Sequence, residues 1–418
     1  MPIVVKAMAG PPAGSPARPN LRHLAVVAEV ARRGSAQAAA RAAFLSQPAV
    51  TQAIAAVERW LGGALFLRSA TGMAPLPAAL GCLARIERAL AELRSAGAGP
   101  LLQVPGAARG LRGLSVAQLE ALIAVVEQGG ASAAARALGV SRPTLHRATR
   151  SLESLAGVAL FEQTSFGLTP TREATRLARH AQLAFSELAQ ARAELAAAAG
   201  AEVGRTVVGV MPLARSALVP RALMAFAGRH PAHTVELLDG TYESLLAALR
   251  GGRAHVLVGA LRDPAPASDV QEEFLFEDPL ALVVRARHPL ARQRAPGPAA
   301  ARAPGRAELA RYPWIAPRRG SPLRRHYERL FPVDPPAGVI ECNSLEVARA
   351  LLLNSDRVML ASARPAGLEL ESGLLAVLPH PDGPVARRIG LTLRRGWQPT
   401  ATQAALIAQL RAEARALA

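Results

Sequence analysis

Two groups of polar and cationic side chains, each beginning at a Ser-x-Pro tripeptide, have residue types that contact nucleic acid. Glutamine can bind adenine and arginine can bind guanine through paired hydrogen bonds in the major groove, and arginine also binds phosphate. The first group begins at Ser46 and the second at Ser141. We expect these side chains to contact DNA: Ser46, Gln47, Pro48, Thr51, Gln52 and Arg68 in the first group, and Ser141, Arg142, Pro143, Thr144, His146, Arg147 and Arg150 in the second.

The two groups belong to an internal repeat with a constant offset. Residues 34–76 and 129–171 share three landmarks that all lie 95 positions apart: Ala-Ala-Ala-Arg at 38–41 and 133–136, Ser-x-Pro at 46–48 and 141–143, and Leu-Phe at 65–66 and 160–161. An alanine-rich composition alone does not produce ungapped similarity of this length. The sequence therefore predicts two copies of one structural unit.

Each copy predicts three helices followed by a β-hairpin. In the first copy, an apolar-periodic segment ends at Gly34, a helix-stop signal, and a short alanine-rich helix follows. Ser46 is expected to cap a third helix, with Pro48 in its first turn, where no hydrogen bond is lost. One face of that helix is apolar, so the polar groups face outward; the apolar positions are Val50, Ile54, Val57 and Leu61, matched by Leu145, Thr149, Leu152 and Ala156. The hairpin carries Arg68 in the first copy and Gln163 in the second.

Three segments of the first copy closely resemble the DNA-binding signature of LysR-type transcription regulators: Ala38–Arg41, Ser46–Thr51 and Leu65–Arg68. The second copy resembles it more loosely. The resemblance implies a winged helix-turn-helix that places its recognition helix in the major groove of double-stranded DNA, with RNA polymerase as a further candidate partner. Ordinary members of this family carry one such unit. The duplication therefore leaves open which copy reads DNA, and one copy could serve only as a spacer in a dimer.

A long helix is predicted after the second copy, over residues 173–200. Leu177, Phe185, Leu188 and Leu195 are spaced to form the apolar seam of a coiled coil. In the resembled family this helix makes the dimer, so a homodimer or homotetramer is expected. The alternative is one amphipathic helix that packs on its own domain. Residues 97–113 are rich in glycine and proline, which indicates a flexible joint between the two copies.

From Arg205 onward, short apolar strands alternate with helices, which favours a parallel α/β sheet. Predicted strands are 206–210, 235–238 and 255–260, and predicted helices are 218–226, 241–250 and 345–353. Ligands of such sheets gather at the carboxyl ends of strands and at helix N-termini. The expected effector contacts are Met211, Leu213, Ala214, Arg215, Ser216, Tyr242, Arg262, Gly320, Ser321, Asn343 and Ser344. An ordinary helix cap is the alternative interpretation of each helix start.

Residues 203–418 also resemble the effector-binding domain of the same family, a two-lobed fold similar to periplasmic binding proteins. Val208–Arg215 and Gly259–Arg262 resemble the subgroup that includes a galactose-binding-protein regulator. This resemblance implies a sugar or a related metabolite as effector.

The expected fold is thus a mainly α N-terminal half with two winged helix-turn-helix units and an α/β two-lobed effector domain. The expected segments are a disordered N-terminus (1–20), the first unit (21–96), a linker (97–113), the second unit (114–172), a linker or dimerisation helix (173–200) and the effector domain (201–418). Lobe one is expected to comprise 205–283 and 374–418, and lobe two 284–373.

The net charge of +18 and the pI of about 11.5 favour an anionic partner, first nucleic acid and then an anionic membrane surface. Compositional bias toward arginine is the alternative explanation. Two cysteines are too few for a disulfide framework or a metal site, and no cofactor is expected. No apolar run is long enough to cross a membrane, and no signal-peptide pattern occurs in the first twenty residues, so a cytoplasmic location is expected.

Enzymatic motifs are absent from the sequence. The chain has one lysine, Lys6, so it cannot contain a phosphate-binding Gly-Lys loop, and it has no His-Glu-x-x-His or Gly-x-Ser-x-Gly motif. His288 and His380 are expected at the surface and not in a catalytic site. A transport solute-binding protein is disfavoured by the duplicated first half. An architectural DNA-binding protein with a non-sensing C-terminal domain is the remaining alternative.

Overall fold

The computed structural model describes residues 19–69, 72–96, 111, 113–164, 167–211, 218–262, 264–265, 267–292, 303–333, 335–362 and 372–417. The chain divides into two compact units, which are described separately below. Unit 1 comprises residues 1–204 and 251–253, and unit 2 comprises residues 205–250 and 254–418.

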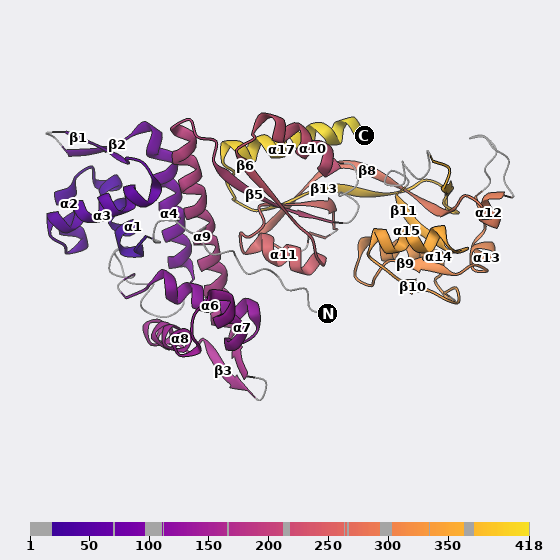
Figure 1. The fold of residues 1–418 in the computed structure, drawn as a ribbon, viewed down its shortest axis with the longest axis horizontal. Coiled ribbons are helices and arrows are strands. Elements are labelled where there is room, and N and C mark those ends of the chain that lie inside the picture. The colour runs from indigo at the N-terminus through magenta and orange to yellow at the C-terminus, as the bar shows by residue number, and fades with distance from the viewer. Residues whose placement is uncertain are drawn as a thin grey trace. The chain divides into compact units, whose positions relative to one another are not determined.

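Unit 1 contains the two predicted repeat copies (Figure 1). The first copy consists of α1 (Leu21–Arg33), α2 (Ala36–Ala43), α3 (Gln47–Leu61), β1 (Phe66–Ser69) and β2 (Gly72–Pro75). The second consists of α6 (Val116–Gln128), α7 (Ala131–Leu138), α8 (Arg142–Ala156), β3 (Phe161–Thr164) and β4 (Gly167–Pro170). Each hairpin is antiparallel. Every boundary of the second copy keeps the predicted repeat offset, so the three-helix and hairpin prediction is confirmed.

Local capping explains why the two copies begin and end their helices at equivalent positions. Ser46 and Ser141 accept the backbone N–H groups of Ala49 and Thr144. Gly34 and Gly129 end the first helix of each copy in the left-handed conformation, both with φ of 67°. Without a Cβ, glycine adopts this conformation at little cost, which makes it a strong helix-stop signal.

Two long helices follow the copies and pack along each other (Figure 1). They are α4 (Leu80–Ser95), which follows the short 3-10 helix η1 (Pro77–Ala79), and α9 (Arg172–Ala198). Leu177, Leu188 and Leu195 of α9 are buried in the core of unit 1, with Phe185 partly buried against it. The seam expected to join two chains is therefore buried within one chain, where α4, α6 and α3 all pack on α9.

Residues 1–18 and most of the expected linker, 97–110 and 112, lie outside the described residues. Asn20 departs from the expectation of a disordered N-terminus: its side chain accepts the Arg22 N–H at 2.9 Å and caps α1. Leu111, near the end of the linker, is buried in the core of unit 1. The amphipathic pattern of α1 did not reveal that Asn20 is ordered as its N-cap.

Unit 2 is built on a nine-stranded sheet with the order β10-β9-β11-β8-β13-β7-β5-β6 and with β12 paired to β8. Its strands are β5 (Gly204–Val210), β6 (His233–Leu238), β7 (Val256–Ala260), β8 (Val270–Arg285), β9 (Trp314–Ala316), β10 (Ile340–Glu341), β11 (Val358–Ser362), β12 (Leu375–Leu378) and β13 (Val385–Arg394). Its helices are α10 (Leu218–Arg229), α11 (Tyr242–Arg250), α12 (Pro289–Arg292), α13 (Arg306–Leu309), α14 (Pro322–Leu330), α15 (Leu345–Leu353) and α17 (Ala401–Leu417). The predicted strand–helix alternation is confirmed.

The sheet is mixed, so the expectation of a parallel sheet is wrong for β8 and β13, which run against their neighbours. β5 pairs with β7 in parallel, and β9 pairs in parallel with β10 and β11. β8 and β13 pair antiparallel with each other. β8 also pairs antiparallel with β11, and β13 with β7. These two strands pass from one hydrophobic core to a second one, and the two cores define the two lobes.

The predicted division between the lobes is wrong at two places. Leu280 and Leu282 of β8 were assigned to lobe one, and so was Leu378 of β12, but all three lie in the second core beside Trp314. β8 is a continuous strand of 16 residues, so the lobe boundary falls within it. A run of buried strand residues does not reveal which of two cores each side chain enters.

His288 and His380 are buried, with 0% and 5% of their surface exposed, so the prediction that they lie at the surface is wrong. Local hydrogen bonds make the burial of His288 tolerable. His288 Nδ1 accepts the Leu290 N–H at 3.0 Å, and Nε2 lies 3.1 Å from the carbonyl oxygen of Asp356. Burial lowers the pKa of both imidazoles, because the charged form loses its hydration.

We expect unit 2 to lose stability as the pH falls below about 6.5, the pKa of an unfolded histidine. Below this pH the histidine of the unfolded chain binds a proton, whereas the buried His288 of the folded chain does not. The free energy of unfolding is therefore highest above about pH 6.5. It decreases as the pH falls from about 6.5 to the lowered pKa of the folded state. Urea unfolding between pH 7.5 and 5 measures this. His288→Asn retains an acceptor for Leu290 and should show a smaller pH dependence; an unchanged dependence would contradict the assignment.

Candidate nucleic-acid interface and effector site

The first copy presents the polar edge of α3 to solvent. Gln47, Pro48 and Gln52 are exposed, and Thr51 is half-buried with its hydroxyl donating to the carbonyl oxygen of Gln47 at 3.2 Å. Ser46 is exposed and acts as the helix cap. On the opposite face of α3, Val50, Ile54, Val57 and Leu61 are buried, as predicted. The exposed edge is therefore available to a duplex groove.

The second copy presents a more cationic edge on α8. Every residue predicted to contact DNA in this copy is exposed: Ser141, Arg142, Pro143, Thr144, His146, Arg147 and Arg150. Leu145, Thr149, Leu152 and Ala156 are buried beneath them. Arg150 lies 3.4 Å from Glu153 and its side chain remains 71% exposed, so this surface pair leaves the guanidinium accessible.

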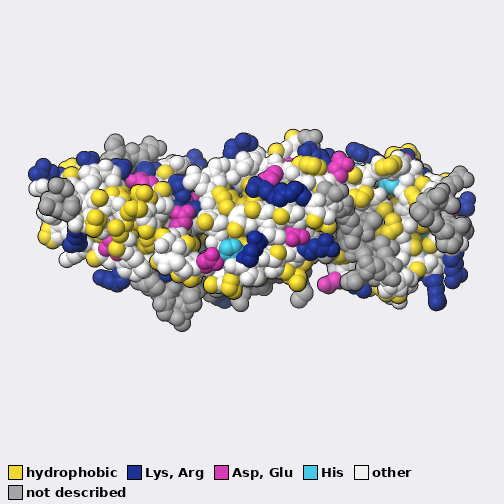
Figure 2. Space-filling model, turned by 90° about the horizontal axis from the view of Figure 1, so that it is seen from above, with side chains coloured by type: hydrophobic (Ala, Val, Ile, Leu, Met, Phe, Trp, Pro, Cys, Tyr) yellow, Lys and Arg dark blue, Asp and Glu magenta, His cyan; other side chains and the backbone are white. Residues whose placement is uncertain are grey.

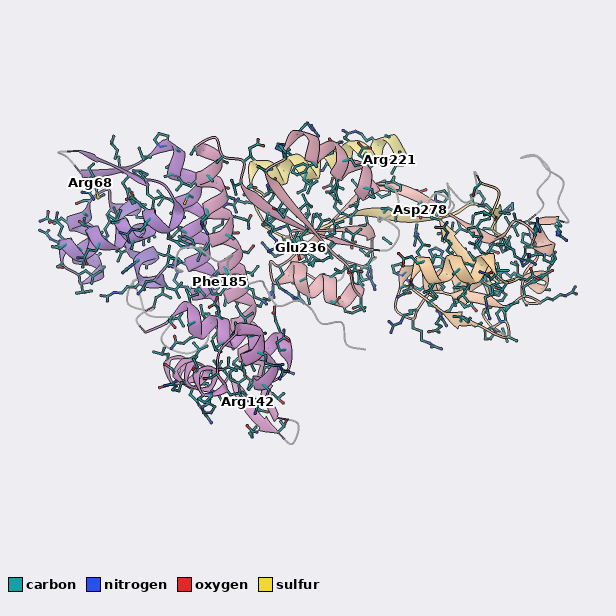
Figure 3. The ribbon with its side chains drawn as sticks, viewed as in Figure 1. Arg68, Arg142, Phe185, Arg221, Glu236 and Asp278 are labelled. Carbon is teal, nitrogen blue, oxygen red and sulfur yellow. The ribbon has the colours of Figure 1, made fainter. Side chains whose placement is uncertain are left out.

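A glutamate in each copy fixes the hairpin to the recognition helix. Glu58 Oε1 accepts the Leu65 N–H at 2.8 Å, and Glu153 Oε1 accepts the N–H groups of Leu160 and Phe161 at 2.9 and 3.0 Å. These bonds hold each hairpin beside its own helix. Arg68, on β1, is exposed there (Figure 3), whereas the second copy exposes Gln163 at the equivalent place.

Arginine side chains are spread over the face of the molecule shown in Figure 2 and do not gather in one patch on it. The large positive charge therefore does not by itself locate the DNA-binding surface. The repeat motifs identify the two helices, α3 and α8, that expose glutamine and arginine.

The contact between α4 and α9 is held by buried polar groups that the sequence analysis missed. Arg85 of α4 is 1% exposed, and its guanidinium donates to Glu194 at 2.6 Å, to Gln190 at 2.9 Å and to Glu187 at 3.2 Å. Arg88, which is partly exposed, also donates to Glu187, at 3.0 Å. At the other end of the contact, His180 Nδ1 lies 2.8 Å from Glu92. The two helices are therefore antiparallel.

Two of these polar contacts are related by the sequence repeat. Arg85 and Glu92 of α4 correspond to His180 and Glu187 of α9 at the repeat offset of 95 residues. The pairs Arg85–Glu187 and His180–Glu92 are therefore equivalent contacts, as a local two-fold axis requires. The signal that could have revealed this contact was the extension of the repeat into the two long helices.

In unit 2, two of the predicted effector residues, Tyr242 and Gly320, contact a third, Arg262. Its guanidinium lies 3.6 Å from the ring centre of Tyr242, and Nη2 donates to the carbonyl oxygen of Gly320 at 3.1 Å. Its backbone N–H donates to the Glu272 carboxylate. Met211, at the end of β5, packs beside Gly259 of β7, where an added Cβ would clash with the Met211 side chain. The carboxyl ends of β5 and β7 thus meet the start of α11.

Ser321, Asn343 and Ser344 lie at two further helix starts. Ser321 caps α14 and Ser344 caps α15, each accepting a backbone N–H, so both serines have an ordinary structural role. Asn343 Oδ1 accepts the Arg318 N–H at 3.1 Å and ties the two turns together. The remaining predicted residues lie outside the described part of the chain: Leu213, Ala214, Arg215 and Ser216.

Two polar atoms of this cluster are buried and have no hydrogen-bond partner among the described residues. They are the Tyr242 hydroxyl and Arg262 Nε. Burial raises the pKa of Tyr242 to about 12, so the hydroxyl is a neutral donor at physiological pH. Buried polar atoms without partners are rare in folded proteins. These two donors therefore suit a ligand that carries hydrogen-bond acceptors.

Within the described residues, no group of three or more His, Cys, Asp or Glu side chains is arranged to hold a metal ion. None of the helices described is long and apolar enough to span a membrane.

Comparison with known proteins identifies both halves of the chain. A family model described as bacterial regulatory helix-turn-helix protein, lysR family, matches residues 21–80 and again 116–175. A model described as LysR substrate binding domain matches residues 199–415. The matches cover both repeat copies and most of unit 2.

Individual relatives agree with these models. The HTH-type transcriptional regulator GalR of Pseudomonas putida is 33% identical over 400 residues, which are 94% of this chain and 97% of that protein. The HTH-type transcriptional regulator PcaQ of Agrobacterium fabrum is 29% identical over 70% of this chain and 93% of its own. Among solved structures, ArgP from Mycobacterium tuberculosis has a TM-score of 0.54 at 19% identity, covering 72% of this chain and 97% of ArgP.

Proposed function

Because this chain belongs to the LysR family of bacterial transcription regulators, we propose that both of its recognition helices contact DNA and that an effector bound to unit 2 modulates this contact. The observation that supports the first part is the exposure of a polar edge on both proline-led helices, α3 and α8. Ser46 and Ser141 position these helices, and Arg68 contacts phosphate beside α3. The chain works by binding and not by catalysis.

DNA affinity is expected to fall steeply with salt, because each neutralised phosphate contributes about 0.9 to the slope of log K against log salt.

Arg142→Ala/Arg147→Ala should weaken binding to a selected operator by tenfold or more, on the order of one lost bidentate base contact, and reduce this slope. Arg221→Ala/Arg415→Ala removes the same charge from exposed positions of unit 2 and serves as the control. Gel-shift titrations at several salt concentrations measure both quantities. Equal losses in the two double variants would contradict the proposed interface.

For the second part of the proposal, we place the effector in contact with Arg262 and Tyr242. Their buried donors without partners support a ligand rich in acceptor oxygens, such as a sugar or a related metabolite. In this proposal the effector is also bound by Met211, Gly320, Ser321, Asn343 and Ser344, together with Leu213, Ala214, Arg215 and Ser216.

A ligand that binds only the folded state raises its stability by about 2.7 kcal/mol at a hundred times its dissociation constant. We expect one member of a panel of monosaccharides and sugar acids to raise the melting temperature of the full chain, and Arg262→Ala to abolish the shift. Arg221→Ala, at an exposed position of α10 (Figure 3), should retain it. If the whole panel leaves the melting temperature unchanged, the sugar proposal fails, and an architectural DNA-binding role without sensing becomes the better account.

The chain acts in the cytoplasm as a homo-oligomer in this proposal, with RNA polymerase as a further partner.

The linker helix α9 ends six residues before β5 of unit 2 begins, at Ala198 and Gly204. A change in unit 2 therefore reaches the helix pair through a short connection, which supports a population shift between two DNA-binding arrangements.

A further inference from the structure

We infer that one chain reads two unlike half-sites on DNA, a guanine-specified half-site through α8 and an adenine-specified half-site through α3. The inference rests on the proposed function, in which both recognition helices contact DNA. To that function it adds which base each half-site is recognised by, and that one chain suffices for one pair of half-sites.

The first argument is that the α4–α9 pair holds both recognition helices in one body. In the first copy α1 packs on α4, and in the second copy α6 packs on α9. Side chains of both copies and both long helices share one continuous core, including Leu24, Leu90, Leu119 and Leu188. Binding of one recognition helix therefore places the other beside the same duplex, which raises its effective concentration without a second chain.

The second argument is the local two-fold relation between the equivalent contacts Arg85–Glu187 and His180–Glu92. An antiparallel pair of equivalent helices, each carrying its own three-helix unit, presents its two recognition helices in opposite directions. Two identical chains related in this way read a palindrome. In this chain the related helices come from one polypeptide, so their sequences are free to differ.

The third argument is that the two exposed edges do differ at equivalent positions. Gln47 corresponds to Arg142, Thr51 to His146 and Gln52 to Arg147. Between Gln47 and Val57, α3 contains no cationic residue, whereas α8 exposes three arginines over the matching stretch. Arginine binds guanine O6 and N7 in the major groove, and glutamine binds adenine N6 and N7. The two half-sites are therefore inverted relative to each other but unlike in sequence.

The first experiment compares three duplexes with the full chain. One carries the pair of half-sites selected from random-sequence DNA, and the other two are palindromes made from either half-site alone. We expect each palindrome to bind at least about tenfold more weakly, since one recognition helix then meets the wrong bases. A palindrome that binds as tightly as the selected pair would overturn the inference.

The second experiment assigns each half-site to its helix. Replacing guanine with 7-deazaguanine in the guanine-rich half-site removes the N7 acceptor, and we expect about tenfold weaker binding or more. Arg142→Ala/Arg147→Ala should abolish this sensitivity, and Gln47→Ala/Gln52→Ala should retain it while losing sensitivity to 7-deazaadenine in the other half-site. All four positions are exposed, and circular dichroism verifies that each variant is folded. Both variants responding alike to both modified bases would contradict the assignment.

Stoichiometry provides the third measurement. Titration of the chain with a duplex that carries one pair of half-sites should saturate at one duplex per chain, whether or not the chains associate through unit 2. Saturation at one duplex per two chains would mean that each chain supplies one reader, and the inference would fail while the regulator assignment stands. Failure of the proposed function is distinct: the wild-type chain would then select no DNA sequence at all.

Discussion

Replacing Arg85 with alanine is expected to lower the free energy of unfolding of unit 1 by about 3–5 kcal/mol, the usual cost of removing one partner from a buried ion pair. Arg85 is 1% exposed and neutralises the carboxylates of Glu187 and Glu194 across the α4–α9 contact. Without it, Glu194 and Gln190 lose a charged donor in a site that admits little water. Urea unfolding, with hydrogen exchange of α4 and α9 measured by mass spectrometry, reports this loss.

Arg88→Ala is the matched control for Arg85→Ala. Arg88 lies on the same helix and also binds Glu187, but its side chain is 32% exposed, so its removal should cost about 1 kcal/mol or less. Arg85→Ala should also uncouple the two recognition helices, so that a duplex with both half-sites loses its advantage over a duplex with one. Similar, small effects of the two substitutions would show that the buried network does not hold the helix pair.

Replacing Asp278 with alanine is expected to lower the free energy of unfolding of unit 2 by a similar amount, about 3–5 kcal/mol. Asp278 is fully buried on β8, where this strand pairs with β13 between the two cores (Figure 3). It accepts hydrogen bonds from Arg387, at 2.9 Å, and from the Ser362 hydroxyl. Burial lowers the pKa of Arg387, and Asp278 opposes this shift. Its removal leaves a buried guanidinium without its carboxylate.

Hydrogen exchange of β8 and β13 measures the effect of Asp278→Ala. Asp382→Ala is the control, because it breaks a surface ion pair with Arg306 in the same unit. The side chain of Asp382 is 39% exposed and that of Arg306 is 47% exposed. That substitution should change stability by about 1 kcal/mol or less. Asp278→Ala should also weaken the thermal response to effector, since the lobes lose a fixed connection. Equal exchange in Asp278→Ala and the control would contradict this role.

The sequence predicted the exposed edges of α3 and α8 better than the contacts around Arg262, and the reason is the range of the interactions involved. The exposed edges of α3 and α8 follow from capping serines and amphipathic spacing, which act within a few residues. Arg262 and Tyr242 were also predicted, from the rule that ligands gather at strand ends. Their stacking, and the buried donors that it leaves without partners, depend on how β7, α11 and the Gly320 turn are placed in space.

The amino-acid sequence by itself determined the repeated unit, its helix boundaries, its outward-facing side chains and the strand–helix alternation of unit 2. Only the tertiary structure decided that α9 pairs with α4 of its own chain, that β8 and β13 cross between two cores, and that His288 is buried. Caps and amphipathic faces are encoded by neighbouring residues. The α4–α9 contact joins Arg85 to Glu187, which lie 102 positions apart, and such pairing is set by the packing of the whole chain.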